Sequence, residues 1–311
     1  MKMVAANGAE IPALGFGAYG MSRNDMLRTI PVALDAGFRH IDTAQIYRNE
    51  AEVGECVQAS GLDRAEVFLT TKVWVANYAG GAFAASVDDS LRKLRTDYID
   101  LLLLHWPNPG VPLGEQIAGL NAAVRAGKVR HIGVSNFNRR MLAEAVRLSE
   151  APIATNQVEY HPYLNQRLLI EECRRLGVAV TAYCGMAVGR VFADPVLRDI
   201  AARRGRTVAQ IVLRWLIQQD GVVALSRTTN PARIPANFDV FGFELSAEDM
   251  RAISRLAARD SRIVSPTGLS PAWDPTPALA ACPQVGRGPG AHPAGIVKTD
   301  VENRQSRRRS S

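Results

Sequence analysis

The 311-residue chain contains few cysteines, and none of them are close neighbours in sequence. The four are Cys56, Cys173, Cys184 and Cys282. Because no two of them form a C-x-x-C pair, their spacing supports neither a zinc ribbon nor a redox dithiol. Four scattered thiols are instead typical of a protein from a reducing compartment.

The chain also lacks a long apolar run. None approaches the roughly 18 residues that are needed to span a membrane, and residues 1–8 lack the apolar core of a signal peptide. With 47% hydrophobic and 22% charged residues, the composition is globular and excludes disorder along the whole chain. We therefore expect a cytoplasmic protein that does not contact a membrane.

Positive charge is concentrated at the C-terminus. The net charge is +7, and residues 275–311 hold six Lys or Arg residues against two acidic ones. The same stretch mixes prolines with glycines and ends in Ser and Arg, a composition that is typical of disorder. A basic tail could bind nucleic acid, but we favour a solvated, disordered tail and expect no nucleic-acid partner.

Between residues 12 and 230 one pattern recurs: a short β-rich apolar run, a polar turn and a helical stretch. Eight runs are candidate strands: Ala13–Gly17, Phe38–Asp42, Val67–Lys72, Ile99–His105, Val129–Ser135, Ile153–Gln157, Val178–Tyr183 and Val222–Ser226. The helix-patterned segments are Met26–Ala36, Glu50–Ser60, Ala82–Leu94, Leu113–Ala126, Arg140–Ser149, Asn165–Leu176, Ala193–Arg204 and Ala209–Gln219. Many of these helices stop at a glycine, which tolerates the positive φ of a C-terminal cap.

Alternating strands and helices predict a parallel sheet. Eight such units suit a closed (β/α)8 barrel, an α/β TIM barrel, over residues 1–274, followed by the disordered tail at residues 275–311. An open, doubly wound sheet is the alternative, but no G-x-G-x-x-G motif follows the first strand. Asn7 and Gly8 predict a tight hairpin turn before the barrel.

Polar residues follow three neighbouring candidate strands. Asp42 ends the second strand, Lys72 the third and His105 the fourth, and Tyr47 follows in the loop after the second. Chemistry in such barrels occurs at these strand ends, so we expect the four side chains to share one mouth. Each alone has an ordinary structural explanation, as a cap, a solvated lysine or a core histidine. Lys72 lies in an apolar run, however, and a buried ammonium needs a carboxylate, which Asp42 can supply.

This set of side chains suits the protonation of a carbonyl oxygen. A tyrosine hydroxyl has a pKa of about 10, and a nearby ammonium stabilises the phenolate and lowers that pKa. Tyr47 could then give a proton to a carbonyl oxygen as it becomes an alkoxide, while His105 hydrogen-bonds the same oxygen. The set contains no hydride source, so an exchangeable reductant must bind.

A phosphate site is predicted after the eighth candidate strand. Asn230 is a good helix N-cap and Pro231 a good first helical residue. The free N–H groups of a helix N-terminus attract phosphate. Arg227 precedes this N-terminus and Arg233 lies in its first turn, and two arginines suit a phosphate monoester. An ordinary capped surface helix with two solvated arginines is the alternative.

Four further residues at strand ends could hold the rest of a nucleotide cofactor. Tyr183 could stack on a flat ring, and Ser135, Asn136 and Gln157 could hydrogen-bond an amide. The alternatives are a core tyrosine and ordinary turn or cap residues.

Several stretches of the chain resemble the aldo-keto reductase family. They are Gly37–Tyr47, Thr70–Trp74, Leu94–Pro107, Gly127–Phe137 and Asn156–Glu159. The likeness extends in order over about residues 5–274. Within the family the chain is most similar to the small bacterial 2,5-diketo-D-gluconate reductases of the B type. This closer match is carried by Asp42–Tyr47 followed by Asn49 and Glu50, and by the ending from Arg262–Pro266 through Pro271–Asp274.

The resemblance implies a catalytic tetrad, with Tyr47 as the proton donor, and a bound NADPH. The tetrad residues are Asp42, Tyr47, Lys72 and His105. The implied cofactor contacts are Ser135, Asn136, Gln157, Tyr183, Arg227, Thr228, Arg233 and Asn237. The first three match ligands of the nicotinamide carboxamide, and Tyr183 matches a tyrosine that stacks on the ring. The last four match residues that bind the 2′-phosphate and adenine. The resemblance also implies a monomer.

Three departures from the family pattern affect the expected site. The family's Tyr-Ser-Pro-Leu reads Tyr183-Cys184-Gly185-Met186, which leaves the pyrophosphate contacts open. Its Pro-Lys-Ser reads Ser226-Arg227-Thr228, which keeps the positive charge and the NADP preference. Its Gly-Thr-Trp reads Gly17-Ala18-Tyr19, which alters one pocket wall.

We therefore expect an NADPH-dependent reductase of small aldehydes or ketones, such as 2,5-diketo-D-gluconate or methylglyoxal-like carbonyls. The expected substrate contacts are Tyr19, Trp74, His105 and Trp106, with Trp273 as a further candidate. Two alternatives remain open at this point. One is a Schiff-base aldolase that uses Lys72, and the other is a nucleotide-binding regulatory barrel with little catalysis.

Overall fold

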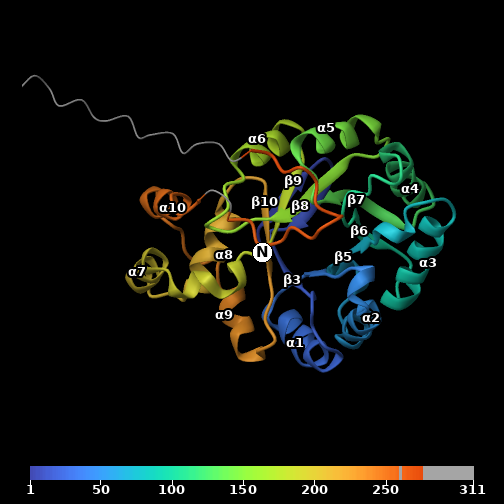
Figure 1. Cartoon of the computed structure of the whole chain (residues 1–311). Coiled ribbons are helices and arrows are strands. Elements are labelled where there is room, and N and C mark those ends of the chain that lie inside the picture. The colour runs from blue at the N-terminus through green and yellow to red at the C-terminus, as the bar shows by residue number, and fades with distance from the viewer. Residues whose placement is uncertain (259–260, 276–311) are drawn as a thin grey trace, which may run out of the picture. The chain divides into compact units, whose positions relative to one another are not determined.

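Eight parallel strands close into a barrel in the computed structural model, which describes residues 1–258 and 261–275. Around the barrel the strands follow the order β10-β3-β4-β5-β6-β7-β8-β9, and helices surround them (Figure 1). The predicted (β/α)8 barrel is confirmed. The predicted tail lies outside the described residues, apart from Pro275.

The strand ends agree with the predicted ones to within two residues. The barrel strands are β3 Leu14–Gly17, β4 His40–Asp42, β5 Phe68–Val73, β6 Ile99–Leu104, β7 Val129–Ser135, β8 Ile153–Glu159, β9 Ala179–Tyr183 and β10 Val222–Ser226. Most of their residues are buried and apolar, as expected for a sheet that is covered on its outer face by helices.

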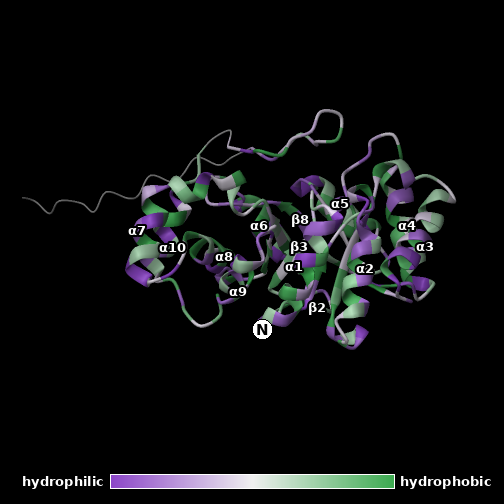
Figure 2. Ribbon diagram, turned by 90° about the horizontal axis from the view of Figure 1, so that it is seen from below, coloured by the Kyte–Doolittle hydropathy of each residue, from purple (hydrophilic) through white to green (hydrophobic). Residues whose placement is uncertain are grey.

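Ten α-helices lie within the described residues. They are α1 Arg23–Ala36, α2 Glu50–Ala59, α3 Ala82–Leu94, α4 Leu113–Arg125, α5 Arg139–Leu148, α6 Arg167–Arg175, α7 Pro195–Arg204, α8 Val208–Gln218, α9 Ile234–Phe238 and α10 Ala247–Ser254. Polar and apolar residues alternate along the surrounding helices, as amphipathic helices packed on a barrel require (Figure 2). No helix in the part of the chain that the structure describes is both long and apolar enough to cross a bilayer.

One helix start lies three residues from the expected one, and one helix was not predicted. Helix α1 begins three residues earlier than predicted, since Ser22 and Asp25 form a reciprocal capping box. Helix α10 was not predicted, although Ser246 and Asp249 form the same kind of box before it. The predicted glycine stop of α1 is confirmed, because Gly37 takes the left-handed conformation at its C-terminal cap.

A hairpin precedes the barrel, as Asn7 and Gly8 predict. Strands β1 Met3–Ala6 and β2 Ala9–Pro12 pair antiparallel, and both turn residues have positive φ. The Asn7 side chain donates hydrogen bonds to the carbonyls of Ile153 (2.8 Å) and Leu176 (3.1 Å). This contact fixes the hairpin against the amino-terminal end of β8, away from the strand ends that carry the predicted site.

Candidate active site

Three neighbouring strands deliver the predicted tetrad to one place. Asp42 is the last residue of β4, Lys72 lies near the end of β5, and His105 directly follows β6. Strand β5 pairs with β4 on one side and β6 on the other. Tyr47 ends a short 3-10 turn, Gln45–Tyr47, in the loop after β4. The predicted grouping of these side chains is confirmed.

A buried ion pair lies at the base of the site. Lys72 Nζ lies 2.6 Å from Asp42 Oδ1, and it also donates a hydrogen bond to the Thr43 carbonyl at 2.7 Å. The Lys72 side chain is fully buried, and burial lowers its pKa although the Asp42 charge opposes that shift. The carboxylate's other oxygen, Oδ2, accepts a hydrogen bond from Gln157 Nε2 at 2.8 Å. Both charges are therefore paired, as the sequence predicted for a buried ammonium.

Tyr47 and His105 meet above this pair. The Tyr47 hydroxyl oxygen lies 3.5 Å from His105 Nε2, and Lys72 Nζ lies 5.1 Å from the centroid of the Tyr47 ring. Burial, and then the Lys72 charge, lower the pKa of His105 well below 6.5, so its imidazole is neutral near pH 7. Within the described residues, the buried His105 Nδ1 has no hydrogen-bond partner.

The expected direction of the Tyr47 pKa shift is wrong for this arrangement. Burial raises the pKa of the Tyr47 hydroxyl well above its ordinary value of 10.0, and the negative charge of Asp42 adds to the rise. The ammonium of Lys72 does not reverse this effect, because its charge is already paired with Asp42. Tyr47 is thus a neutral phenol that keeps its proton over the whole neutral range.

Aromatic side chains flank the tyrosine and the histidine. The ring of Tyr19 packs edge-on against Tyr47 at 5.1 Å between centroids, and Trp74 packs against His105 at 5.4 Å. Tyr19 is 66% exposed, so this part of the wall faces solvent. Trp106 is buried, and its ring packs against Trp273 at 6.4 Å.

The predicted amide-binding residues gather on the other side of Asp42. Ser135 and Gln157 are paired across β7 and β8, and Ser135 Oγ donates to the Gln157 carbonyl at 2.8 Å. Asn136 Nδ2 donates to the His105 carbonyl at 3.1 Å, and the Tyr183 hydroxyl donates to Asn136 Oδ1 at 2.7 Å. Each of these side chains makes at least one hydrogen bond within the protein, which fixes its orientation at the mouth of the barrel.

The predicted phosphate site is built differently from the expected helix N-terminus. Asn230 Oδ1 accepts from the Ala232 N–H, which confirms the cap. The element that follows is only a 3-10 turn, Pro231–Arg233, before the five-residue α9. So short an element has a small dipole. The positive charge that a phosphate needs would therefore have to come from Arg227 and Arg233. Thr228 and Asn237 are buried beside this turn, and Asn237 Nδ2 donates to Ser226 Oγ at 3.2 Å.

Arg227 makes contacts that no local pattern predicts. Its Nε donates to the Tyr19 carbonyl at 2.5 Å and its Nη2 to the Gly20 carbonyl at 3.1 Å. The guanidinium therefore joins the loop after β10 to the loop after β3, which carries the aromatic ring beside Tyr47. Arg233 is exposed on the same turn.

Glu159 is a buried carboxylate whose role the sequence did not indicate. It ends β8, and its oxygens accept hydrogen bonds from the N–H groups of Ile263 (2.7 Å) and Val264 (2.8 Å). His161 Nε2 lies 2.8 Å from the same carboxylate. These bonds anchor the C-terminal segment, residues 261–275, which carries Trp273 to its place beside Trp106. The available signal was a charged residue at the end of a buried strand, which must be paired.

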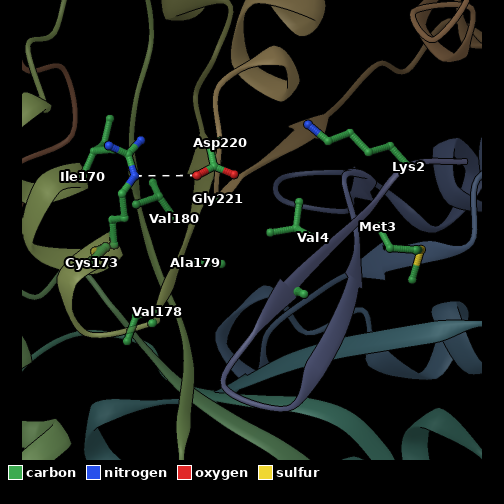
Figure 3. Close-up of a pocket in the computed structure, with 13 residues that line it drawn as sticks. Lys2, Met3, Val4, Ile170, Cys173, Val178, Ala179, Val180, Asp220 and Gly221 are labelled. Carbon is green, nitrogen blue, oxygen red and sulfur yellow. Dashed lines mark ion pairs between the residues drawn. The ribbon is translucent and has the colours of Figure 1, made fainter.

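A separate cavity of about 240 Å³ lies at the opposite, amino-terminal end of the barrel (Figure 3). It is lined by the first hairpin and by the start of β9, and its ion pair joins Arg174 and Asp220 at 3.7 Å. Asp220 is 89% exposed in its side chain, so this pair is a weak surface contact. The cavity contributes no residue to the tetrad.

Comparison with known proteins agrees with this geometry. Residues 13–258 match the model of the Aldo/keto reductase family. The chain is 40% identical over 267 residues to the methylglyoxal reductase DkgB of Yersinia pestis, which covers 85% of this chain and 99% of that protein. It is 39% identical, with the same coverage, to the methylglyoxal reductase DkgB of Salmonella typhimurium.

Solved structures that are similar to this chain are also described as reductases of this kind. A crystal structure provisionally described as a 2,5-diketo-D-gluconic acid reductase B is 59% identical, has a TM-score of 0.88, and covers 88% of this chain and 98% of its own. An aldo/keto reductase from Brucella melitensis is 38% identical with a TM-score of 0.77, covering 82% and 98%. The chain therefore belongs to the aldo/keto reductase family and is an oxidoreductase that acts on carbonyl groups.

Proposed function

We propose that this protein reduces small aldehydes and ketones to alcohols with NADPH, and that Tyr47 donates the proton. The observation that supports this most strongly is the contact between the Tyr47 hydroxyl and His105 Nε2, 3.5 Å apart, above the buried pair of Lys72 and Asp42. Two hydrogen-bonding groups directed at one point suit a carbonyl oxygen that gains negative charge.

The protonation states fit these roles. Tyr47 holds its proton near pH 7, and a developing alkoxide is a far stronger base than a phenolate, so the transfer runs from tyrosine to substrate oxygen. The neutral His105 hydrogen-bonds and orients the same oxygen. The ammonium of Lys72 lies 5.1 Å from the centroid of the Tyr47 ring and, together with Asp42, forms the base of the site under the proposed proton donor.

The remaining polar residues suit a nicotinamide dinucleotide. When bound, NADPH would supply the hydride. Ser135, Asn136 and Gln157 would hold the carboxamide, and Tyr183 would stack on the ring. At the other end of the cofactor, Arg227, Thr228, Arg233 and Asn237 would hold the 2′-phosphate and adenine. These groups lie near or after the ends of β7, β8, β9 and β10, which are neighbours in the barrel, so they would form a continuous path along one side of the mouth.

The substrate is proposed from the relatives together with the open aromatic wall. Proteins similar to this chain are named for methylglyoxal and for 2,5-diketo-D-gluconic acid, both of which are small dicarbonyl compounds. Tyr19, Trp74 and Trp106 would line the substrate pocket beside His105, with Trp273 next to Trp106. We propose that this enzyme takes carbonyl compounds of the same class. The monomeric state implied by the family stays a prediction.

The two alternative functions find less support. A Schiff-base aldolase needs a lysine that a substrate carbonyl can reach, whereas Lys72 is fully buried and makes two hydrogen bonds. A regulatory barrel without catalysis would not need a complete tetrad, and all four side chains are present and in contact.

Replacing Tyr47 with Phe should lower the turnover of a carbonyl substrate by at least about 100-fold, because the acid catalyst is lost. NADPH should still bind, as measured by fluorescence titration, while turnover is followed by NADPH oxidation. Tyr98→Phe is the matched control, since the buried Tyr98 hydroxyl has no partner among the described residues and lies outside the site. Full activity in Tyr47→Phe would contradict the assignment of the proton donor.

In the cofactor-free protein, Tyr47 should ionise only above pH 10.0, because burial disfavours the phenolate. The proton is retained below that raised pKa and is lost as the pH rises through it. Ultraviolet absorbance of tyrosinate, compared between the unsubstituted protein and Tyr47→Phe, measures this ionisation. A difference that titrates near neutral pH would show that Lys72 outweighs burial.

Arg227→Met should weaken NADPH binding by about 10- to 100-fold, because a charge-assisted hydrogen bond to phosphate is lost. NADH binding should change far less, since NADH has no 2′-phosphate. Arg125→Met removes a similar exposed guanidinium from α4 and is the control. Isothermal titration of both cofactors measures the difference, and an equal loss for NADH and NADPH would rule out phosphate recognition by Arg227.

A further inference from the structure

Asn49 occupies the N-cap position of α2 but does not cap the helix with its side chain. Asparagine is among the best N-cap residues. Asn138 uses its side chain in this way before α5, and Asn230 does so before the 3-10 turn Pro231–Arg233. Asn49 Oδ1 instead accepts a hydrogen bond from Thr43 Oγ1 at 2.6 Å, and its Nδ2 donates to the Ala18 carbonyl at 2.9 Å. A local preference that is given up in this way is often explained by function.

The bond between Thr43 and Asn49 joins the two ends of the segment that carries Tyr47. Residues 43–49 leave β4, form the 3-10 turn that ends at Tyr47, and enter α2. Arg48, directly after Tyr47, takes a left-handed backbone conformation with φ of 56°, which costs free energy for a residue with a side chain. Thr43 and Asn49 are 1% and 3% exposed, so water does not compete for their bond.

The same bond leads to the buried ion pair. The backbone carbonyl of Thr43 accepts a hydrogen bond from Lys72 Nζ at 2.7 Å, while its side chain is held by Asn49. Asn49, Thr43, Lys72 and Asp42 thus form one continuous hydrogen-bonded chain. Moving Thr43 would move an acceptor of the ammonium that lies under the Tyr47 ring.

The second bond of Asn49 reaches the aromatic wall. The Ala18 carbonyl accepts a hydrogen bond from Asn49, and the Ala18 N–H donates to the Asp42 carbonyl at 2.9 Å. The next residue, Tyr19, packs its ring against Tyr47. One amide side chain therefore connects the segment of the proton donor with the loop that flanks it.

We propose that Asn49 is a positioning residue for proton transfer, which acts through Thr43 and Ala18 on Lys72 and Tyr47. It does not touch the substrate oxygen itself. The proposal rests on the proposed reduction of a carbonyl by NADPH, with Tyr47 as the proton donor. It differs from a purely structural role because it requires a slower chemical step in protein that is fully folded and has NADPH bound.

The test uses Asn49→Ala and the isosteric Thr43→Val, each of which removes the bond between the two side chains. The single-turnover rate of carbonyl reduction by the NADPH-loaded protein should fall by up to about 100-fold in each, since small displacements of a reacting group slow chemistry strongly. The KM for the carbonyl and the Kd for NADPH should stay close to those of the unsubstituted protein. The double variant should lose little more than Asn49→Ala alone, because the bond between the two side chains can be lost only once.

Two controls separate positioning from loss of fold. Thr43→Ser keeps the hydroxyl and should regain most of the rate that Thr43→Val loses. Ser246→Ala removes a cap from α10, far along the chain, and should lower the melting temperature without changing the rate. If Asn49→Ala does not fold, Thr43→Val and Thr43→Ser carry the same comparison.

Unchanged single-turnover rates in Asn49→Ala and Thr43→Val would overturn the proposal, as would a loss in Thr43→Ser equal to that in Thr43→Val. Strictly additive losses in the double variant would also overturn it. These outcomes are distinct from failure of the proposed function, in which the unsubstituted protein itself would not oxidise NADPH with any small carbonyl compound.

Discussion

The buried ion pair of Lys72 and Asp42 is the interaction on which the rest of the site depends. Removing both charges from water is costly, and their attraction offsets that cost only where the remaining hydrogen-bonding groups are also satisfied. Here the Thr43 carbonyl accepts a second bond from the ammonium, and Gln157 donates to the second carboxylate oxygen. The pair therefore determines where the ends of β4, β5 and β8 lie relative to one another.

Several loops are held in place around this pair. The three successive carbonyls of residues 18–20 accept hydrogen bonds from Asn49 or from Arg227, so the loop after β3 is fixed from both sides. One side is the segment of the proposed proton donor, and the other is the proposed phosphate site. The proposed acid chemistry and cofactor recognition thus share one short loop.

The C-terminal segment, residues 261–275, is held in a similar way, by a buried charge that must be paired. Glu159 is fully buried at the end of β8, and the backbone N–H groups of Ile263 and Val264 pair with it. In both places a buried carboxylate at a strand end organises the irregular segments above the barrel. The aromatic side chains of the proposed substrate pocket lie on those segments.

Much of the fold could be predicted because its signals are local. The eight apolar runs and the glycine stop of α1 are short-range features, and the barrel strands follow them to within two residues. The pairing of Lys72 with Asp42 also followed from a general rule, that a buried ammonium needs a carboxylate. The tetrad residues were therefore brought together as expected, although their catalytic roles stay a proposal.

What could not be predicted depends on contacts between distant residues or on competing effects. Arg227 bonds to Tyr19 and Gly20 from 207 or more positions away in sequence, which no local pattern encodes. Asn49 gives up the cap that its local context favours. The pKa of Tyr47 depends on the balance between burial and a nearby cation, and the sequence does not show how deeply the Tyr47 hydroxyl is buried.

The most direct test of this account is a double-mutant cycle on the ion pair, with Asp42→Asn, Lys72→Met and the two combined. The free energy of unfolding, from urea denaturation, is the quantity to compare. Each single variant should lose about 3–5 kcal/mol, because it leaves one buried charge unpaired. The combined variant should lose clearly less than the two single losses together. Losses that simply add would show that the pair does not organise the site.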